Sequence, residues 1–313
     1  MSTDNTVGSV LGSKLFEGNV GTAYAAFNGR DPYYTEMAEF VVSEVTQANE
    51  QEINSVLEIG AGTGVSTAVI LKRMKAVVSA TEPNETMRCH LELNTMGDPR
   101  VNIHALKAEL LNPDTVGMHD AVVCCQMFHL LRDTLDPSLK AINSCLRTGG
   151  TLSLDFGPSN YSDWKCKLHD FRSKSKPKPE EIITELSHPL SRIAHGLAYG
   201  YVRETYPTFD RANLWADISK AFSLSDLESA FERQGFRLVR VNETLVPIVG
   251  SRIINFIRNW WTTWCRWPPL DKLPIEDKLK IVGAGVRGFF EADQNLLNVT
   301  AYHPSVVITA RKL

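Results

Sequence analysis

The stretch Val56-Leu57-Glu58-Ile59-Gly60-Ala61-Gly62-Thr63-Gly64 decides how this 313-residue chain folds. Its apolar first half predicts a buried strand. The three glycines that follow let the backbone turn tightly and approach a ligand, because no Cβ stands in the way. A helical pattern then runs through Met74, so amide N–H groups at its start would point toward that ligand. The stretch therefore predicts the ligand-binding turn of an α/β domain.

The chain on either side of this turn alternates short apolar runs with helical patterns. Strands are predicted at 55–59, 76–81, 101–106, 121–125, 151–156, 236–241 and 305–310, and helices at 65–74, 84–96, 136–146 and 223–235. The 121–125 run is apolar throughout, as expected of a strand covered on both faces. This rhythm predicts a mainly parallel, doubly wound sheet whose strands all point their carboxyl ends to one side.

Two long segments interrupt the pattern, and they set the predicted domain organisation. Residues 157–221 and 247–298 are expected to be helical insertions, with no clear strand in 157–220, that cap the carboxyl edge of the sheet and bind substrate. The core then comprises 14–156, 222–246 and 299–313, and residues 1–13 are expected to be a disordered lead-in.

Composition and charge exclude several classes of protein. The formal net charge is −3, so the chain lacks the excess of positive charge with which proteins bind the phosphates of nucleic acids, and no nucleic-acid partner is expected. No window of eighteen apolar residues predicts a membrane span. The polar N-terminus does not resemble a secretory signal, and the six cysteines form no C-x-x-C pair, which together predict reduced thiols in a cytoplasmic protein. No His, Cys or carboxylate spacing predicts a metal site.

Two acids next to the glycine turn indicate which chemical groups the ligand carries. Glu58 would repel a pyrophosphate, but its carboxylate can accept a hydrogen bond or ion pair from an ammonium group. Glu82 ends the second strand, where it can accept hydrogen bonds from both hydroxyls of a ribose. Val65 stands where the dinucleotide fingerprint has its third glycine. An NAD-dependent oxidoreductase therefore remains an alternative, disfavoured by Glu58 and by the glycine spacing.

Together these residues resemble the class I S-adenosylmethionine-dependent methyltransferases of the small-molecule type, which include natural-product and ubiquinone-biosynthesis enzymes. The resemblance covers 24–156 and 222–241. It also includes the runs 120–130 and 146–152, the latter with Thr148 where the family usually has proline. It implies a Rossmann-like sheet of seven strands with the last one antiparallel. Cofactor contacts are implied for Tyr24, Arg30, Glu58, Gly60, Ala61, Gly62, Gly64, Glu82, Pro83, Ala108, Glu109, Leu110 and Gln126. For Tyr24 and Arg30 the spacing departs from the family's form, and an exposed polar turn is an equal alternative.

The resemblance also implies S-adenosylmethionine as methyl donor and S-adenosylhomocysteine as product, with a small, partly apolar metabolite as acceptor. His129 follows the fourth strand, in the loop expected beside the methyl group, and is the candidate base; contact with the cofactor or simple packing is the alternative. Tyr34, Trp260 and Trp264 are candidate substrate contacts, although a tryptophan stripe at helical spacing also fits plain helix packing. Methylation at oxygen, nitrogen or carbon, a non-methylating reaction such as cyclisation, and the oligomeric state all stay open.

Overall fold

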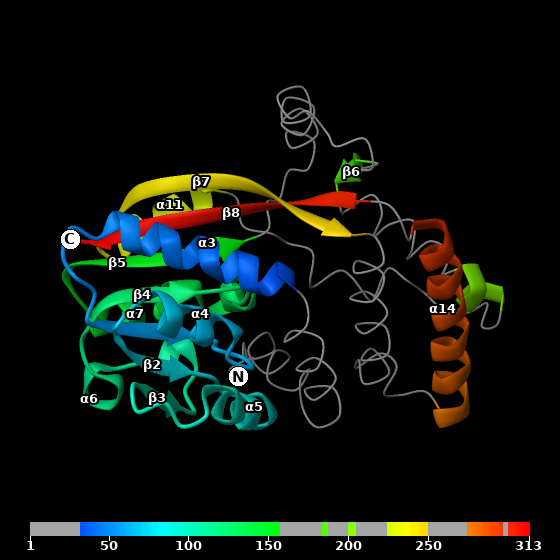
Figure 1. Ribbon diagram of the computed structural model, residues 1–313, viewed down its shortest axis with the longest axis horizontal. Helices are drawn as coiled ribbons and strands as arrows, with labels where there is room; N and C mark the ends of the chain where they lie inside the picture. Colours follow the sequence, from blue (N-terminus) through cyan, green and yellow to red (C-terminus); the bar gives the residue numbers. More distant parts are fainter. Residues whose placement is uncertain (1–31, 157–182, 187–199, 205–223, 250–273, 297–299) are drawn as a thin grey trace, which may run out of the picture. The chain divides into compact units, whose positions relative to one another are not determined.

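The computed structural model describes residues 32–156, 183–186, 200–204, 224–249, 274–296 and 300–313. Its helices and strands are shown in Figure 1. The helices are α3 Pro32–Ala48, α4 Val65–Arg73, α5 Glu85–Thr95, η1 Ala108–Leu110, α6 Pro113–Val116, η2 Phe128–Thr134, α7 Leu135–Cys145, α11 Leu224–Arg233 and α14 Ile275–Leu296. The strands are β1 Ser55–Ile59, β2 Val77–Thr81, β3 Val101–His104, β4 His119–Cys124, β5 Leu146–Phe156, β6 Ile183–Leu186, β7 Phe236–Val249 and β8 Thr300–Lys312.

The chain divides into two compact units. The core unit comprises 1–158, 221–244 and 305–313, and the second unit comprises 159–220 and 245–304. Within the second unit, the guanidinium of Arg287 on α14 lies over the ring of Tyr201, 4.6 Å from its centroid. No helix in the described part of the chain is long and apolar enough to cross a membrane.

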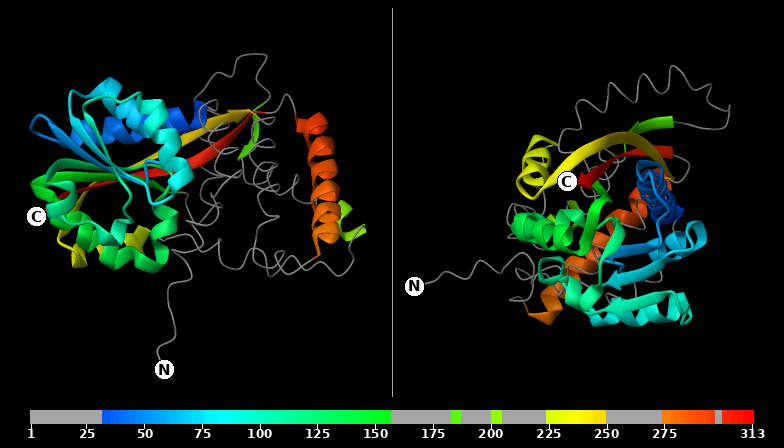
Figure 2. Two further views of the ribbon diagram at one scale, coloured as in Figure 1. Left: turned by 90° about the horizontal axis from the view of Figure 1, so that it is seen from below. Right: turned by 90° about the vertical axis from the view of Figure 1, so that its left-hand side faces the viewer.

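The strand order confirms a Rossmann-like sheet that is mainly parallel. It runs β3-β2-β1-β4-β5-β8, with β7 also paired to β8. The pairs β1–β2, β1–β4, β2–β3 and β4–β5 are parallel, whereas β8 is antiparallel to β5, as the resemblance implied. The long connections fold into helices that cover both faces. Figure 2 shows α3, α4 and α5 on one face of the core sheet and α7 and α11 on the other.

One prediction about the insertions is wrong. Residues 157–220 were expected to hold no clear strand, but β6 pairs in parallel with the start of β8, where Ile183 lies opposite Thr300. This strand makes the sheet eight-stranded. A run of four residues carries too little periodicity to be distinguished from loop, and its partner lies more than a hundred residues away in the sequence.

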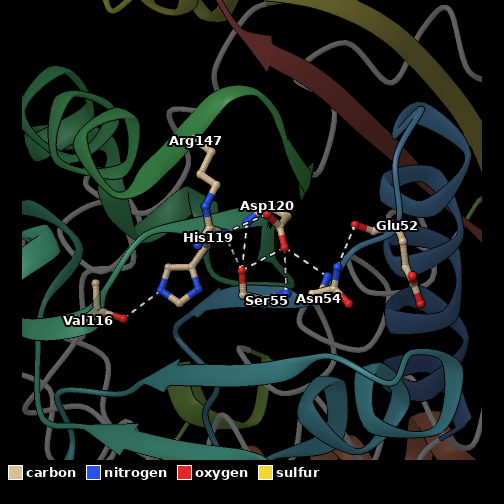
Figure 3. Close-up of polar contacts among 7 residues, drawn as sticks. All are labelled: Glu52, Asn54, Ser55, Val116, His119, Asp120 and Arg147. Atoms are coloured by element: carbon tan, nitrogen blue, oxygen red, sulfur yellow. Dashed lines mark hydrogen bonds and ion pairs between the residues drawn. The ribbon is translucent and has the colours of Figure 1, made fainter.

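A polar cluster at the amino ends of the strands fixes the register between β1 and β4 (Figure 3). Asp120 Oδ2 accepts hydrogen bonds from the backbone N–H groups of Asn54 and Ser55, at 3.0 and 2.9 Å. Its Oδ1 accepts from Arg147 Nη1 at 2.7 Å. Burial alone would raise the pKa of Asp120, but the hydrogen bonds from Ser55, Asn54 and Arg147 together lower it. The carboxylate thus ties β1, β4 and β5 together at the end of the sheet opposite the glycine turn.

Candidate functional site

The glycine turn follows the carboxyl end of β1 and has a backbone that other residues rarely adopt. Gly60, Gly62 and Gly64 have φ angles of +66°, +58° and +91°, all in the left-handed region. The turn is closed by two backbone hydrogen bonds of 2.9 Å, from Ala61 N to Thr81 O and from Gly64 N to Ala61 O. The three glycines are therefore required by backbone geometry, whatever the turn binds.

The three glycines differ in what surrounds them. An added Cβ at Gly60 would lie 2.6 Å from Cγ of Met127, and one at Gly64 would lie 2.9 Å from Cδ1 of Leu91. At Gly62 the nearest atom, Cε of Met87, would be 3.8 Å away. A Cβ at the middle glycine would thus make only ordinary van der Waals contacts, whereas at the outer two it would clash with the protein. Gly62 is therefore the least crowded of the three for a ligand that approaches the backbone.

Glu82 holds the turn from the neighbouring strand. Its Oε2 accepts a hydrogen bond from the backbone N–H of Gly62 at 3.0 Å, and its Oε1 accepts one from Asn84 N at 2.8 Å. The side chain is buried, and burial raises its pKa against the lowering effect of these hydrogen bonds. The structure therefore places Glu82 directly at Gly62 in the middle of the turn, and its contact with a ribose stays a prediction.

Glu58 lies in β1, directly before the glycine turn, as its sequence position predicted. Its carboxylate is completely buried and accepts hydrogen bonds from two hydroxyls at the start of α4, those of Ser66 and Thr67, the latter at 2.7 Å. Burial raises the pKa of Glu58 to about 6, although both hydroxyls lower it. The expected contact with an ammonium group remains a prediction. In the structure, Glu58 fixes the first turn of α4 behind the glycine turn.

A second buried acid, which the sequence analysis did not single out, lies at the carboxyl ends of β4 and β5. Asp155 Oδ1 accepts the backbone N–H of Gln126 at 2.6 Å, and Oδ2 accepts the side-chain amide of the same residue. The hydroxyl of Tyr33 donates to Oε1 of Gln126 at 3.3 Å. An acid near the end of the predicted strand 151–156 was the available signal, because a buried carboxylate needs partners.

The structure places the remaining predicted residues as follows. Ala108 is buried on η1, whereas the side chain of Leu110 is 58% exposed. Pro83 is exposed, and Tyr34 is buried and packs edge-on against Tyr33 with ring centroids 5.4 Å apart. The backbone of His129 belongs to η2, but its side chain is not among those that the structure describes. Tyr24, Arg30, Trp260 and Trp264 lie outside the described residues.

Thiol and metal chemistry find no support in the described residues. Burial raises the pKa of Cys124 and of Cys125 well above the ordinary thiol range, so both stay protonated and unreactive at neutral pH. Among the residues with described side chains, no three His, Cys, Asp or Glu side chains are grouped so as to hold a metal ion.

Comparisons with known proteins agree with this geometry. Residues 56–150 match a family model described as a methyltransferase domain. An S-adenosylmethionine-dependent methyltransferase from Geobacter sulfurreducens, solved with S-adenosyl-L-homocysteine, is 13% identical with a TM-score of 0.50, over 93% of this chain and 98% of its own. Magnesium protoporphyrin IX methyltransferase from Synechocystis PCC 6803, solved with bound S-adenosylmethionine, is 10% identical with a TM-score of 0.51, over 100% and 99%. At these identities the likeness shows a shared fold. No curated protein sequence matches the chain.

Proposed function

Because the chain carries a class I, S-adenosylmethionine-dependent methyltransferase domain, we propose that it methylates a small, partly apolar metabolite and releases S-adenosylhomocysteine. The observation that carries this proposal is the pairing of Glu82 with Gly62, the least crowded of the three glycines, across the carboxyl ends of β1 and β2. In doubly wound sheets, ligands bind at this edge.

The residues present fit the adenosyl part of the cofactor. Each oxygen of the Glu82 carboxylate has about two acceptor positions, and each uses one on a backbone N–H group, so both keep capacity for a ribose hydroxyl. At Gly62, the least crowded of the three glycines, the cofactor can approach the backbone. The exposed side chain of Leu110 offers apolar surface for the adenine ring, next to Glu109 as a candidate partner of its amino group.

The methyl-transfer step asks mainly for positioning. When bound, the cofactor would supply a methyl group attached to a positively charged sulfur. The acceptor's electron pair would form the new bond to the methyl carbon, and the sulfur would keep the electron pair of the broken bond. The chain must hold the acceptor about 3 Å from that carbon, in line with the breaking bond, and exclude water. We propose His129, on η2 directly after β4, as the base that takes the acceptor's proton where the acceptor carries one.

The acceptor is expected to lie against the insertions. We propose Trp260 and Trp264 as apolar contacts of the acceptor, and Tyr34 as a further candidate contact. Oxygen or nitrogen is the more common methylated atom in such enzymes, whereas indole rings could also stabilise the cation of a carbon methylation. We place the protein in the cytoplasm, with no nucleic-acid partner.

Calorimetry with S-adenosylhomocysteine tests the proposal directly, with NAD as the competing ligand. We expect the wild-type protein to bind S-adenosylhomocysteine and not NAD. Glu82→Gln should weaken binding at least tenfold, because an amide offers one acceptor oxygen where the carboxylate offers two. Glu85→Gln, three residues away on the exposed first turn of α5, is the matched control and should bind as the wild type does.

The reaction itself is tested with a panel of small acceptors, by following S-adenosylhomocysteine release and methylated product by mass spectrometry. Product that forms without S-adenosylhomocysteine release would replace methyl transfer with a cyclisation-type reaction. Absence of any heat with S-adenosylhomocysteine, together with heat from NAD, would overturn the proposed function.

A further inference from the structure

We propose that Asp155 is a positioning residue that acts through Gln126 and Met127 to hold the glycine turn in its binding conformation. This inference rests on the proposed function, because its readout is the affinity for S-adenosylhomocysteine. Asp155 would thus influence the binding of S-adenosylhomocysteine without touching it.

The first link is the clamp that Asp155 places on Gln126. Both carboxylate oxygens are used on this one residue, Oδ1 by its backbone N–H at 2.6 Å and Oδ2 by its side-chain amide. The hydroxyl of Tyr33, at the start of α3, donates to the amide oxygen of Gln126 at 3.3 Å. Gln126, two residues beyond the end of β4, is therefore held from β5 and α3.

The clamp holds Gln126 in a backbone conformation that needs support. Its φ is +54°, and Met96 is the only other non-glycine residue with positive φ in the described part of the chain. Such a conformation costs about 1–3 kcal/mol and persists when its surroundings determine it. Two charge-assisted hydrogen bonds from one carboxylate supply that determination.

The second link connects Gln126 to the glycine turn. The next residue, Met127, packs on Gly60, with its Cγ 2.6 Å from where a Cβ of Gly60 would stand. The carbonyl of Met127 also accepts the N–H of Leu130 at 2.8 Å, which fixes the first turn of η2. A change in the backbone at Gln126 would therefore move the side chain that supports Gly60 and the helix that carries His129.

Ionisation of Asp155 makes the clamp dependent on pH. Burial raises the pKa of Asp155 to about 6, against the hydrogen bonds from Gln126. An ionised carboxylate accepts both N–H groups, whereas protonation turns one oxygen into a donor that faces one of them. The clamp should therefore weaken as the pH falls through about 6.

The other titratable groups around the Asp155 carboxylate either do not change protonation between pH 5.5 and 8 or are the same in the wild type and in an Asp155 variant. The thiols of Cys124 and Cys125 interact electrostatically with Asp155 and stay protonated at and below neutral pH. The Tyr33 phenol donates a hydrogen bond to Gln126, and it is present in both the wild type and an Asp155 variant. Glu58 also has a pKa of about 6, but it is present in both the wild type and an Asp155 variant. Comparing those two proteins isolates the contribution of Asp155.

The test exchanges the acid and the amide. Asp155→Asn leaves a single acceptor oxygen opposite two N–H groups, and we expect it to weaken S-adenosylhomocysteine binding about tenfold at pH 8. In the double variant Asp155→Asn/Gln126→Glu, the new amide donates to the new carboxylate, so both hydrogen bonds are restored. The double variant should therefore bind at least tenfold more tightly than Gln126→Glu alone, which places two carboxylates opposite each other, and this coupling separates the clamp from the cofactor contact predicted for Gln126. In the wild type, affinity should fall from pH 8 to pH 5.5 more steeply than in Asp155→Asn.

Asp120→Asn is the matched control, since it removes an acid with several hydrogen bonds at the opposite end of β4. It should lower the melting temperature and leave the affinity unchanged. If Asp155→Asn does not fold, the comparison of the double variant with Gln126→Glu takes its place, because both proteins carry the same residue at position 126 and differ only in the clamp.

The outcomes separate the two proposals. A folded Asp155→Asn that binds S-adenosylhomocysteine as tightly as the wild type overturns the inference and leaves the proposed function intact. A double variant that binds no more tightly than Gln126→Glu alone also overturns it. A wild-type protein that does not bind S-adenosylhomocysteine overturns both.

Discussion

Replacing Gly62 by alanine separates the backbone demand of the glycine turn from its proposed role in binding. The φ of +58° is strained for alanine by about 1–2 kcal/mol. No atom lies within 3.8 Å of the new Cβ, so the packing itself costs nothing further. Gly97→Ala is the matched control. Its φ is +66°, no atom lies within 4 Å of an added Cβ, and it lies between α5 and the amino end of β3, away from the proposed cofactor site.

Both variants should therefore lose the same 1–2 kcal/mol of unfolding free energy, measured by urea denaturation. Only Gly62→Ala should lose affinity for S-adenosylhomocysteine in calorimetry. The expected loss is about tenfold to hundredfold, since a methyl group forced into a close contact costs about 1–3 kcal/mol. The reasoning is refuted if Gly62→Ala binds like the wild type, or if Gly97→Ala weakens binding equally.

Three further predictions concern acid and base groups. Urea denaturation should show that Glu58→Gln gains about 1 kcal/mol of unfolding free energy over the wild type on going from pH 5 to pH 7.5. The reason is that the pKa of Glu58 is raised to about 6, so the wild type loses stability as this acid ionises between about pH 4.5 and 6. A difference between the two proteins that stays constant with pH would contradict this. Asp120→Asn should cost about 1–3 kcal/mol at pH 7 and progressively less toward pH 3, since a lowered pKa stabilises the folded state above the ordinary Asp range, and a pH-independent cost would count against it. His129→Ala should slow turnover of an identified acceptor at least about a hundredfold with unchanged S-adenosylhomocysteine affinity; turnover within a few-fold of wild type would remove His129 from the mechanism.

The fold of the core was predictable because its strands are buried and closely spaced. The run 55–59 became β1 without any shift, and β2, β3 and β4 differ from their predicted bounds by at most two residues at either end. The strands β5, β7 and β8 are longer than predicted: β5 begins at Leu146, β7 continues to Val249, and β8 begins at Thr300. The antiparallel β8 followed from the family resemblance. The strand β6 was missed because its pairing with Thr300 depends on a contact far away in the sequence, which local periodicity does not contain.

The candidate site was predictable to the level of residue position and less so to the level of hydrogen-bond partner. The glycine turn predicted where a ligand can approach, and the place of Glu82 after β2 predicted that it lies beside that turn. The partners of Glu58 were not predictable, because the hydroxyls of Ser66 and Thr67 reach it only when α4 packs on the sheet. The clamp on Gln126 was missed for the same reason, since Asp155 meets it across two strands.

The acids of the core unit act with opposite sign at the two ends of the sheet. At the amino ends, Asp120 has a lowered pKa, so its ionised form stabilises the fold at neutral pH. At the carboxyl ends, Glu58 and Asp155 both have a raised pKa of about 6, so their ionised forms reduce stability at neutral pH. A buried acid that lowers stability can still be useful where it fixes the position of a neighbouring segment. Both acids do so beside the glycine turn, because Glu58 holds the start of α4 and Asp155 holds the Gln126–Met127 backbone. The acid at the amino ends of the strands therefore stabilises the fold, whereas the acids at the carboxyl ends lower its stability and fix the geometry of the candidate site.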